Sequence, residues 1–520
     1  MLLDMAVEGF GDRVVAGHSD DGLTANGLQE LAKGGAAVVQ ASGADSLVYL
    51  GLNGPSFAVA LFAAARAGVP LVPINYRLGT EQLYALLANH PCALAIADPE
   101  QAAALERAGL TVYSTARWLE VAAEAMPDAP SQTAEAADSS GAAVLIYTSG
   151  TTSAPKGVVL RHQNLVAYVL GTVEFASADE DETTLMSVPP YHIAAVSNVL
   201  TSLYAGRRIL TLPQFTPGGW LHLVREQRVT NAMVVPTMLA RIMDTADLDR
   251  SVPSLRGLAY GGASMPLRVI ETALREWPHV DFVNAYGLTE TSSTVSVLGP
   301  EEHRAAIQTT DPAVRARLAS AGRAVPGIEI EIRGDHNEPR PAGSTGRVWV
   351  RGEQVSGEYA GQGSSFDARG FFDTRDRGRL DAVGYLFLEG RMDDTIIRGG
   401  ENIAPAEIED VLLRHPDIAD AVVVGVPDEE WGQRIEAVVV PRAGAEIDGE
   451  ALRVDIRRTL RGSKTPDRIS SWPELPRTIT GKLVRRTIVD ALVAESERAN
   501  RGSEVDRKAD APTPRPLGSL

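Results

Sequence analysis

The segment Leu47–Tyr76 most constrains the fold, because it alternates strand, helix and strand patterns. Leu47–Leu50 and Val69–Ile74 are short apolar runs typical of buried strands, and Ser56–Ala67 between them has a helical pattern. A strand–helix–strand order places the two strands parallel in one sheet. Leu94–Ala97 adds another such strand. The sequence therefore predicts an α/β fold, with parallel-rich β-sheets layered with helices.

Two later strand-like runs end in glycine and hydroxyl residues. Leu258–Gly262 reads LAYGG, and Asp281–Glu290 reads DFVNAYGLTE. A third apolar run, residues 142–147, leads directly into a loop rich in Ser and Thr. In parallel α/β sheets, ligands bind at the carboxyl ends of the strands. We therefore expect these three strand ends to share one crevice.

The third run leads into Tyr147–Gly157, which reads YTSGTTSAPKG. Its hydroxyl groups, its glycine and Lys156 suit a phosphate, because backbone N–H groups, hydroxyls and a cation can all donate to the anion. The loop lacks the GK[ST] ending of a Walker A motif. The same composition is also typical of a solvated hairpin turn, so the segment alone leaves both interpretations open.

A histidine follows another strand-like run, Thr184–His192, with the sequence TLMSVPPYH. Pro189 and Pro190 end any regular element, so His192 would lie just beyond the end of a strand. It is a candidate to line a pocket. A lone histidine is also compatible with a packed or exposed side chain, and this segment does not separate the alternatives.

Charge and composition exclude several classes of protein. The chain has 520 residues, enough for more than one domain, and a net charge of −18 without a long basic run, which argues against nucleic-acid binding. The single cysteine, Cys92, rules out an internal disulfide and is expected in the core. We find no signal peptide and no apolar stretch of transmembrane length, so we expect a cytoplasmic location and no integral membrane segment.

The second half of the chain has the pattern of antiparallel strands instead of alternating strands and helices. Three stretches alternate like antiparallel strands, namely Gly322–Asp335, Gly343–Gly352 and Gly370–Gly390. Residues 419–441 contain two more strand-like runs, and Leu475–Arg486 is a basic loop before a final helix.

Six segments in this order resemble the motifs of the adenylate-forming superfamily. That superfamily contains acyl-CoA synthetases, the adenylation domains of peptide synthetases, and luciferases, and the chain is most similar to stand-alone acyl-CoA ligases. The segments are Tyr147–Gly157, Tyr286–Glu290, Thr374–Asp376, Gly390–Asp393, Gly399–Glu407 and Pro476–Arg486. The resemblance covers about residues 10–493.

The resemblance implies a large N-terminal domain, residues 1–392, that binds ATP and the acyl group and includes a small β-barrel-like region. It implies a small mobile α+β C-terminal domain, residues 393–497, and we expect a disordered tail over 498–520. A carboxylate would attack ATP to give an acyl-adenylate and pyrophosphate, and coenzyme A would then displace AMP. In-line phosphoryl chemistry of this kind depends on positioning and on charge neutralisation, here with Mg²⁺.

The resemblance also assigns roles to residues of the N-terminal domain. The β- and γ-phosphates would be held by Thr148, Ser149, Gly150, Thr151, Thr152 and Lys156. Gly262, Ala263 and Tyr286 would enclose adenine, and Asn284 would hydrogen-bond its edge. Thr289 would contact the α-phosphate, whereas Glu290, with Thr148, would bind Mg²⁺. Asp376 would accept from the ribose hydroxyls, and Arg391 would also contact the ribose.

Other assignments concern the second step and the acyl group. Lys482 would bridge the substrate carboxylate and the α-phosphate, and Asp393 is the expected hinge. The turn that contains Arg398, Gly399 and Gly400 would face the site during thioester formation, and His192 would gate the acyl pocket. Taken singly, most of these residues are also compatible with caps, turns or solvated charges.

Two positions depart from the family pattern, because Ser153 and Arg375 stand where glycine is usual. Glycine reaches backbone conformations that are unfavourable for other residues, so either change would restrict its loop. The hypothesis that follows is weak adenylation, or a ligase specialised for the thioester-forming half-reaction.

The predicted function is an acid–CoA ligase. The main alternative is an adenylating enzyme that loads a separate acyl carrier protein, and a luciferase-type oxidation or a non-catalytic adenylate-binding regulator is less favoured. The pocket walls are expected from Tyr191–Val196, Val235–Met238, Gly261–Ala263 and Ala285–Gly287, which contain small residues and no Arg or Lys. They favour a hydrophobic or bulky monocarboxylic acid, either fatty, aryl or polycyclic. A homodimer is kept as an open alternative.

Overall fold

The computed structural model describes residues 1–125, 139–148, 155–245, 248–398, 401–428, 430–460, 462–478 and 483–509. Contacts divide the chain into two compact units, Met1–Leu388 and Glu389–Leu520. The division falls within the strand β21 (Leu386–Arg391), and the boundary expected at residue 392 falls directly after that strand.

In the described part of the first unit, nine strands form a sheet in the order β15-β14-β13-β12-β11-β9-β10-β1-β2. Its central run from β13 to β1 is parallel, and β14, β15 and β2 are antiparallel. The bounds are β1 Val14–Ala16, β2 Leu23–Thr24, β9 Thr183–Met186, β10 Arg208–Thr211, β11 Asn231–Val234, β12 Gly257–Gly261, β13 Asp281–Leu288, β14 Ser293–Leu298 and β15 Arg323–Ala324.

A second sheet contains eight of the described strands, in the order β19-β18-β8-β7-β4-β3-β5-β6. The neighbours from β7 to β6 are parallel, with Leu47 opposite Leu71, which confirms the predicted strand–helix–strand unit. The bounds are β3 Leu47–Leu50, β4 Leu71–Pro73, β5 Leu94–Ala97, β6 Thr111–Ser114, β7 Ala142–Thr148, β8 Lys156–Arg161, β18 Glu358–Tyr359 and β19 Gly363–Ser364.

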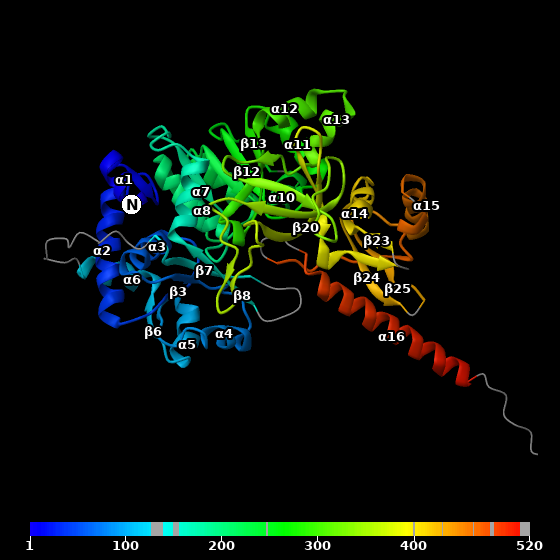
Figure 1. The fold of residues 1–520 in the computed structure, drawn as a ribbon, viewed down its shortest axis with the longest axis horizontal. Helices are drawn as coiled ribbons and strands as arrows, with labels where there is room; N and C mark the ends of the chain where they lie inside the picture. The colour runs from blue at the N-terminus through cyan, green and yellow to red at the C-terminus, as the bar shows by residue number, and fades with distance from the viewer. Residues whose placement is uncertain are drawn as a thin grey trace, which may run out of the picture. The chain divides into compact units, whose positions relative to one another are not determined.

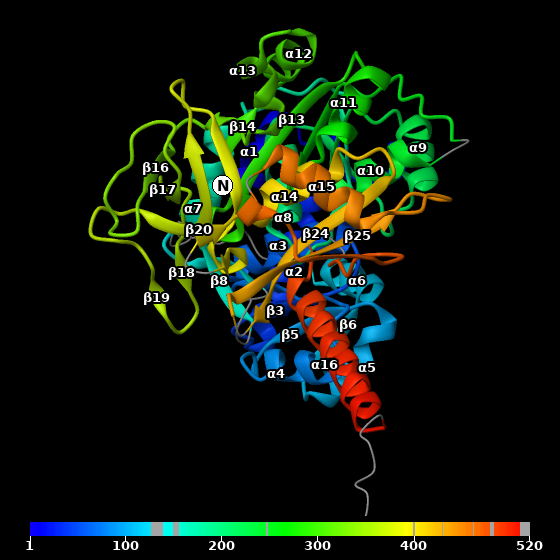
Figure 2. The same cartoon turned by 90° about the vertical axis from the view of Figure 1, so that its right-hand side faces the viewer.

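Helices cover both faces of this second sheet, which explains why its central strands β3, β4 and β5 are apolar at every position. Leu47 and Tyr49 of β3 belong to the core formed with α2 and α3, whereas Val48 and Leu50 belong to the core formed with α4 and α5. Figures 1 and 2 show these helices on opposite sides of β3. The bounds are α1 Leu2–Phe10, α2 Ala25–Ser42, α3 Pro55–Ala67, α4 Thr80–Leu87, α5 Pro99–Arg107 and α6 Thr115–Glu124.

In the nine-stranded sheet, β10 lies on one side of β9, whereas the later strands β11, β12 and β13 lie on its other side. The direction in which successive strands are added therefore reverses after β10. Right-handed crossovers then place α8 on one face and α9, α10 and α11 on the other. Such a switch point is where α/β sheets bind ligands. The bounds are α7 His162–Thr172, α8 Ile193–Ala205, α9 Pro217–Glu226, α10 Pro236–Asp244, α11 Leu267–Glu276, α12 Pro300–Gln308 and α13 Pro312–Arg315.

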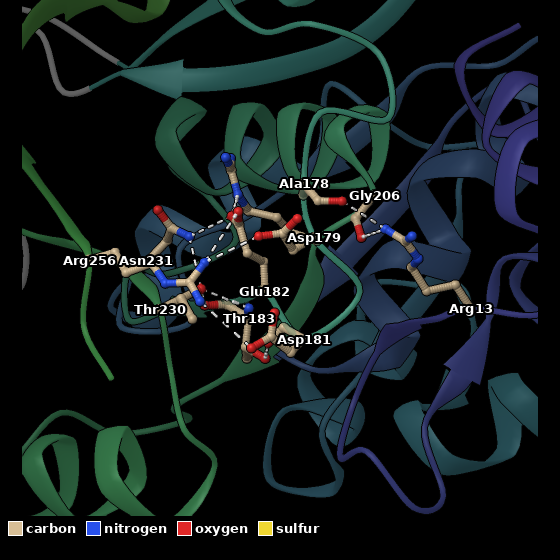
Figure 3. A network of polar contacts seen from close by, with 11 residues as sticks. Arg13, Ala178, Asp179, Asp181, Glu182, Thr183, Gly206, Thr230, Asn231 and Arg256 are labelled. Carbon is tan, nitrogen blue, oxygen red and sulfur yellow. Dashed lines mark hydrogen bonds and ion pairs between the residues drawn. The ribbon is translucent and has the colours of Figure 1, made fainter. Parts of the chain in front are cut away.

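The amino-terminal edge of the same strands is held by a polar network (Figure 3). Glu182 lies 2.7 Å from Nε of Arg207 and accepts a hydrogen bond of 3.1 Å from Asn231. Arg256 lies within 4.0 Å of Glu182 and of Asp179. These contacts tie together the starts of β9, β10, β11 and β12, at the edge opposite to the carboxyl ends.

The predicted β-barrel-like region is a sheet of four described strands in the order β16-β17-β20-β21. It is antiparallel where register is assigned, and its core contains Val348, Val350 and Phe372. The bounds are β16 Glu329–Arg333, β17 Gly346–Arg351 and β20 Phe372–Leu380.

The second unit is α+β, with a sheet of three described strands, β24-β25-β26, and a hairpin of β22 and β23. Its final helix continues past residue 497 to Ala509, into the segment expected to be disordered. The bounds are β22 Ile396–Arg398, β23 Glu401–Ile403, α14 Pro405–Leu413, β24 Ile418–Asp428, β25 Gly432–Pro441, α15 Gly449–Thr459, β26 Arg468–Ser471 and α16 Arg485–Ala509.

One prediction about the core was wrong. Cys92 is exposed, because it lies in the turn between α4 and β5 rather than in the apolar strand that follows. None of the described helices is both long enough and apolar enough to cross a membrane.

Candidate active site

Several predicted site residues lie outside the described residues, so the structure does not test them. They are Ser149, Gly150, Thr151, Thr152, Gly399, Gly400 and Lys482, together with the unusual Ser153. The side chain of Asp393 is also not described.

The predicted phosphate loop connects the two strands of an antiparallel hairpin, β7 and β8, in which Thr148 is opposite Lys156. The Thr148 hydroxyl donates to the carbonyl of Lys156 at 3.5 Å. Both faces of the hairpin are buried, with Ile146 and Val158 in one core and Leu145 and Val159 in another. The two ends of the loop are therefore firmly placed, and Lys156 lies at the end of a rigid strand.

A partly buried polar pair supports the start of this loop. The Tyr147 hydroxyl and Nε2 of His90 lie 2.8 Å apart, and the two rings meet edge to face. Burial raises the pKa of Tyr147 and lowers that of His90 from its ordinary 6.5, so both groups are neutral at pH 7.

The adjacent parallel ends of β12 and β13 bring Gly261 opposite Ala285. A Cβ on Gly261 would lie 2.2 Å from the Ala285 carbonyl oxygen, so the close approach requires glycine. Gly262 and Ala263 follow and are exposed, as expected for a wall of a ligand site. The side-chain amide of Asn284 is predicted to contact adenine. In the structure this amide donates to the Ser320 carbonyl at 2.9 Å.

Tyr286 and Asp376 come together from β13 and β20. The Tyr286 hydroxyl donates to Oδ2 of Asp376 at 2.5 Å. Asp376 is placed by a bulge, since Thr374, Arg375 and Asp376 all lie opposite Val348, and Arg375 has a φ of 59°. The usual glycine at this position is explained by that left-handed conformation, which Arg375 adopts at a cost.

Thr289 and Glu290 lie in a single 3₁₀ turn, Thr289–Thr291, directly after β13. The chain then reverses through Ser292 and Ser293, whose φ angles are 55° and 115°. Nε2 of Gln354 donates to the carbonyls of Thr291 at 3.0 Å and Thr294 at 2.7 Å. This strained reversal therefore fixes Glu290 at the end of the sheet.

Tyr359, which no sequence motif singles out, links two predicted groups. Its hydroxyl donates to Oε1 of Glu290 at 2.8 Å, and Nζ of Lys156 lies 5.4 Å from its ring centroid. Tyr359 is in β18, opposite Val158 of β8. The only sequence signal there is a stretch with Gly357, Gly361 and Gly363, which indicates a loop and no chemistry.

His192 lies at the amino end of α8, half-buried, with its ring 4.6 Å from that of buried Tyr191. Tyr191 also packs edge to face with Tyr76, and burial raises its pKa. Ile193 and Ala194 follow and are partly buried. The segment after β9 therefore presents aromatic and small apolar side chains near the switch point of the sheet.

In the second unit, β22 and β23 form a hairpin with Arg398 opposite Glu401. The Arg398 guanidinium donates to Asp467 at 2.6 Å and to the Ser463 carbonyl at 3.3 Å, and it lies 5.0 Å from the ring of Trp431. These contacts hold the base of the predicted turn. Arg391 is half-buried at the end of β21.

The chain matches two family models. Residues 3–360 match the AMP-binding enzyme model, and residues 407–482 match the AMP-binding enzyme C-terminal domain. It is 35% identical over 454 residues to a feruloyl-CoA synthase from an Amycolatopsis species, covering 85% of this chain and 87% of the relative. It is 33% identical over 487 residues to an indoleacetate–CoA ligase from Aromatoleum aromaticum, covering 88% and 91%.

Among solved structures, the fold is similar to o-succinylbenzoate CoA synthetase from Bacillus subtilis in complex with its acyl-adenylate intermediate. The TM-score is 0.80 at 27% identity, with 94% of this chain and 97% of that chain covered. The same enzyme in complex with ATP and a magnesium ion gives a TM-score of 0.80.

The chain belongs to the AMP-binding enzyme family. Within that family it is an AMP-forming acid–CoA ligase, which joins a carboxylic acid to coenzyme A through an acyl-adenylate and uses ATP with Mg²⁺.

Proposed function

We propose that this ligase activates an aromatic monocarboxylic acid of the arylalkenoic or arylacetic class. The observation that carries the proposal is the segment after β9, where Tyr191 and His192 are followed by the small residues Ala194 and Ala195. Aromatic and small side chains suit a flat ring. The expected walls contain no Arg or Lys to pair with a second carboxylate. The relatives named for feruloyl-CoA and indoleacetate support the same class.

The phosphates of ATP are proposed to bind at the β7–β8 hairpin, with Thr148, Ser149, Gly150, Thr151, Thr152 and Lys156 as the contacting residues. The buried hairpin supports this role because it holds Lys156 and Thr148 at the two ends of the loop. Backbone and hydroxyl donors next to one cation neutralise a phosphate without reorganising.

Glu290, with Thr148, fits a magnesium ion. Oε1 of Glu290 already accepts from Tyr359, and among the described residues Oε2 accepts no hydrogen bond. No group of three or more His, Cys, Asp or Glu side chains in the described chain is arranged to hold a metal. Magnesium is typically bound by one or two carboxylates together with substrate phosphates and water. Bound there, it would neutralise developing phosphate charge.

Adenosine is proposed to lie against Tyr286, Gly262, Ala263 and Asn284, with Asp376 and Arg391 at the ribose. Asp376 accepts from the Tyr286 hydroxyl, and a carboxylate is an acceptor suited to the two ribose hydroxyls. Thr289 would contact the α-phosphate. Lys482 would bring the acid and the α-phosphate together, and the turn of Arg398, Gly399 and Gly400 would serve thioester formation after a rotation at Asp393.

The test is an acid panel in which the two half-reactions are assayed separately. Ferulate, indoleacetate, a long-chain fatty acid and a dicarboxylic acid are compared by acid-dependent ATP–pyrophosphate exchange and by thioester formation with coenzyme A. The proposal expects both activities to be greatest with the aromatic monocarboxylates. Preference for the fatty acid or the dicarboxylic acid would overturn it, and acylation of a carrier protein in place of coenzyme A would establish the alternative acceptor.

The departures at Ser153 and Arg375 are tested by the same assays. If either residue limits adenylation, Ser153→Gly or Arg375→Gly raises pyrophosphate exchange and leaves thioester formation from a supplied acyl-adenylate unchanged. Exchange at the wild-type rate in both variants would reject the idea of a ligase specialised for the second half-reaction.

A further inference from the structure

A short segment that carries no assigned role joins the nine-stranded and eight-stranded sheets of the first unit at the proposed nucleotide site. Residues 353–360, here called the bridge segment, follow β17 and include β18. On one side, the Ala360 amide donates to the Gly157 carbonyl at 2.8 Å, and Glu358 accepts two hydrogen bonds of 2.8 Å from Arg161. These contacts attach the bridge segment to β8, the strand that begins with Lys156.

On its other side, the bridge segment holds the turn of Glu290, which ends a strand of the other sheet. The amides of Ser356 and Gly357 both donate to the Glu290 carbonyl, at 2.8 and 3.2 Å. Gln354 contributes the two hydrogen bonds to the strained reversal after Glu290. These hydrogen bonds hold the backbone of Glu290 in place independently of the contacts of its side chain.

Tyr359 fixes the side chain. A phenol donates a hydrogen bond through its hydroxyl. It donates to Oε1 of Glu290 at 2.8 Å, and its ring lies 5.4 Å from the ammonium of Lys156, within the range of a cation–π contact. One side chain thus contacts both the carboxylate and the cation of the site.

We propose that Tyr359 is the positioning residue for the magnesium ligand Glu290, an inference that rests on the metal role of Glu290 proposed above. Its hydrogen bond orients the carboxylate so that Oε2 is presented to the metal, and its ring keeps Lys156 beside the same group. Partners of metal ligands orient them, and their loss typically lowers metal affinity about 10- to 100-fold.

The experiment measures ATP binding by calorimetry as a function of Mg²⁺ concentration, in the full chain. Tyr359→Phe keeps the ring and the contact with Lys156 but removes the hydroxyl. The Mg²⁺ concentration for half-maximal binding should rise about 10- to 100-fold, whereas ATP binding in EDTA and the thermal midpoint should match wild type. Tyr84→Phe is the matched control, because the Tyr84 hydroxyl accepts from the exposed Arg107 and contacts neither Glu290 nor Lys156 in any described interaction.

Two further variants separate the failure of this inference from that of the proposed function. Glu290→Gln should also raise the Mg²⁺ requirement, and adding Tyr359→Phe to it should have no further effect, because the hydroxyl acts through the carboxylate. A normal Mg²⁺ requirement in Glu290→Gln would remove the metal role of Glu290 and the inference with it. A normal requirement in Tyr359→Phe, with Glu290→Gln impaired, would overturn the inference alone.

Discussion

The hydroxyl of Tyr286 donates to Oδ2 of Asp376 at 2.5 Å, although the two residues are 90 positions apart in the sequence. The pair joins the end of β13 to a bulge in β20. A ring proposed to face adenine and a carboxylate proposed to bind ribose therefore hold each other in place.

Replacing Tyr286 with Phe is expected to raise the KM for ATP roughly 10-fold, because a hydrogen bond to a charged group contributes about 1.5–3 kcal/mol. The ring remains, so the KM for the acid should not change. Steady-state kinetics with each substrate varied in turn checks the prediction, and an unaltered KM for ATP would contradict it.

Arg375→Gly is expected to stabilise the protein by about 1 kcal/mol, since Arg375 has a φ of 59° and glycine reaches that region without steric cost. Arg377→Gly in the same strand is the control and should destabilise, because glycine there adds backbone entropy to the unfolded chain without relieving any strain. Urea unfolding at pH 7 gives both values. A loss of stability in Arg375→Gly would show that contacts of the arginine outweigh its backbone strain.

The Glu182 carboxylate should make stability depend on pH. Burial tends to raise its pKa, but the hydrogen bond and charge of Arg207 outweigh burial and hold the pKa below the ordinary 4.5. Its stabilisation is therefore complete above pH 4.5 and is lost as the pH falls through the lower value of the folded state.

Glu182→Gln should lower the free energy of unfolding at pH 7 by about 1–3 kcal/mol, and the difference from wild type should shrink below pH 4.5. Asp181→Asn is the control, because Asp181 is 63% exposed and lies 3.7 Å from Arg256. It should change stability by less than about 0.5 kcal/mol. If the loss of stability in Glu182→Gln stayed the same at low pH, the charge of Glu182 would be excluded as its cause.

Gly287→Ala is expected to disrupt the turn that carries Glu290. An added Cβ would lie 1.7 Å from the Ser293 carbonyl oxygen, so the backbone of the reversal must move. ATP binding in the presence of Mg²⁺ should fall at least about 10-fold, by analogy with the loss of a ligand-orienting contact. Gly79→Ala should bind normally, as the nearest atom to its Cβ is 4.0 Å away. Normal binding by Gly287→Ala would mean that the turn adapts.

Local patterns predicted much of the fold. Apolar runs such as Leu47–Leu50 gave correct strands because they are buried on both faces, and helices between them required parallel pairing. Sequence alone also placed Tyr286 and Glu290 at a strand end. The residue roles themselves stay predictions, including those of Lys482 and of the phosphate-loop residues that lie outside the described part of the chain.

The remaining features of the site depend on contacts between residues far apart in the chain, which no local sequence pattern predicts. Tyr359 reaches Glu290 across 69 positions, and nothing local to either residue indicates the partner. The amide of Asn284 likewise donates to the Ser320 carbonyl, a contact that the sequence around Asn284 does not indicate. Cys92 was placed in the core from its apolar neighbours, but a turn two residues before a strand is decided by chain geometry rather than by hydropathy.

The bridge segment has a consequence for how the enzyme is made. Because it connects β8 of one sheet to the Glu290 turn of the other, the proposed nucleotide site requires both sheets. During synthesis, residues 353–360 emerge after both β8 and the Glu290 turn, so a nascent chain that ends before them lacks the connection between these two parts. Assembly of the proposed nucleotide site therefore comes late in the synthesis of the first unit.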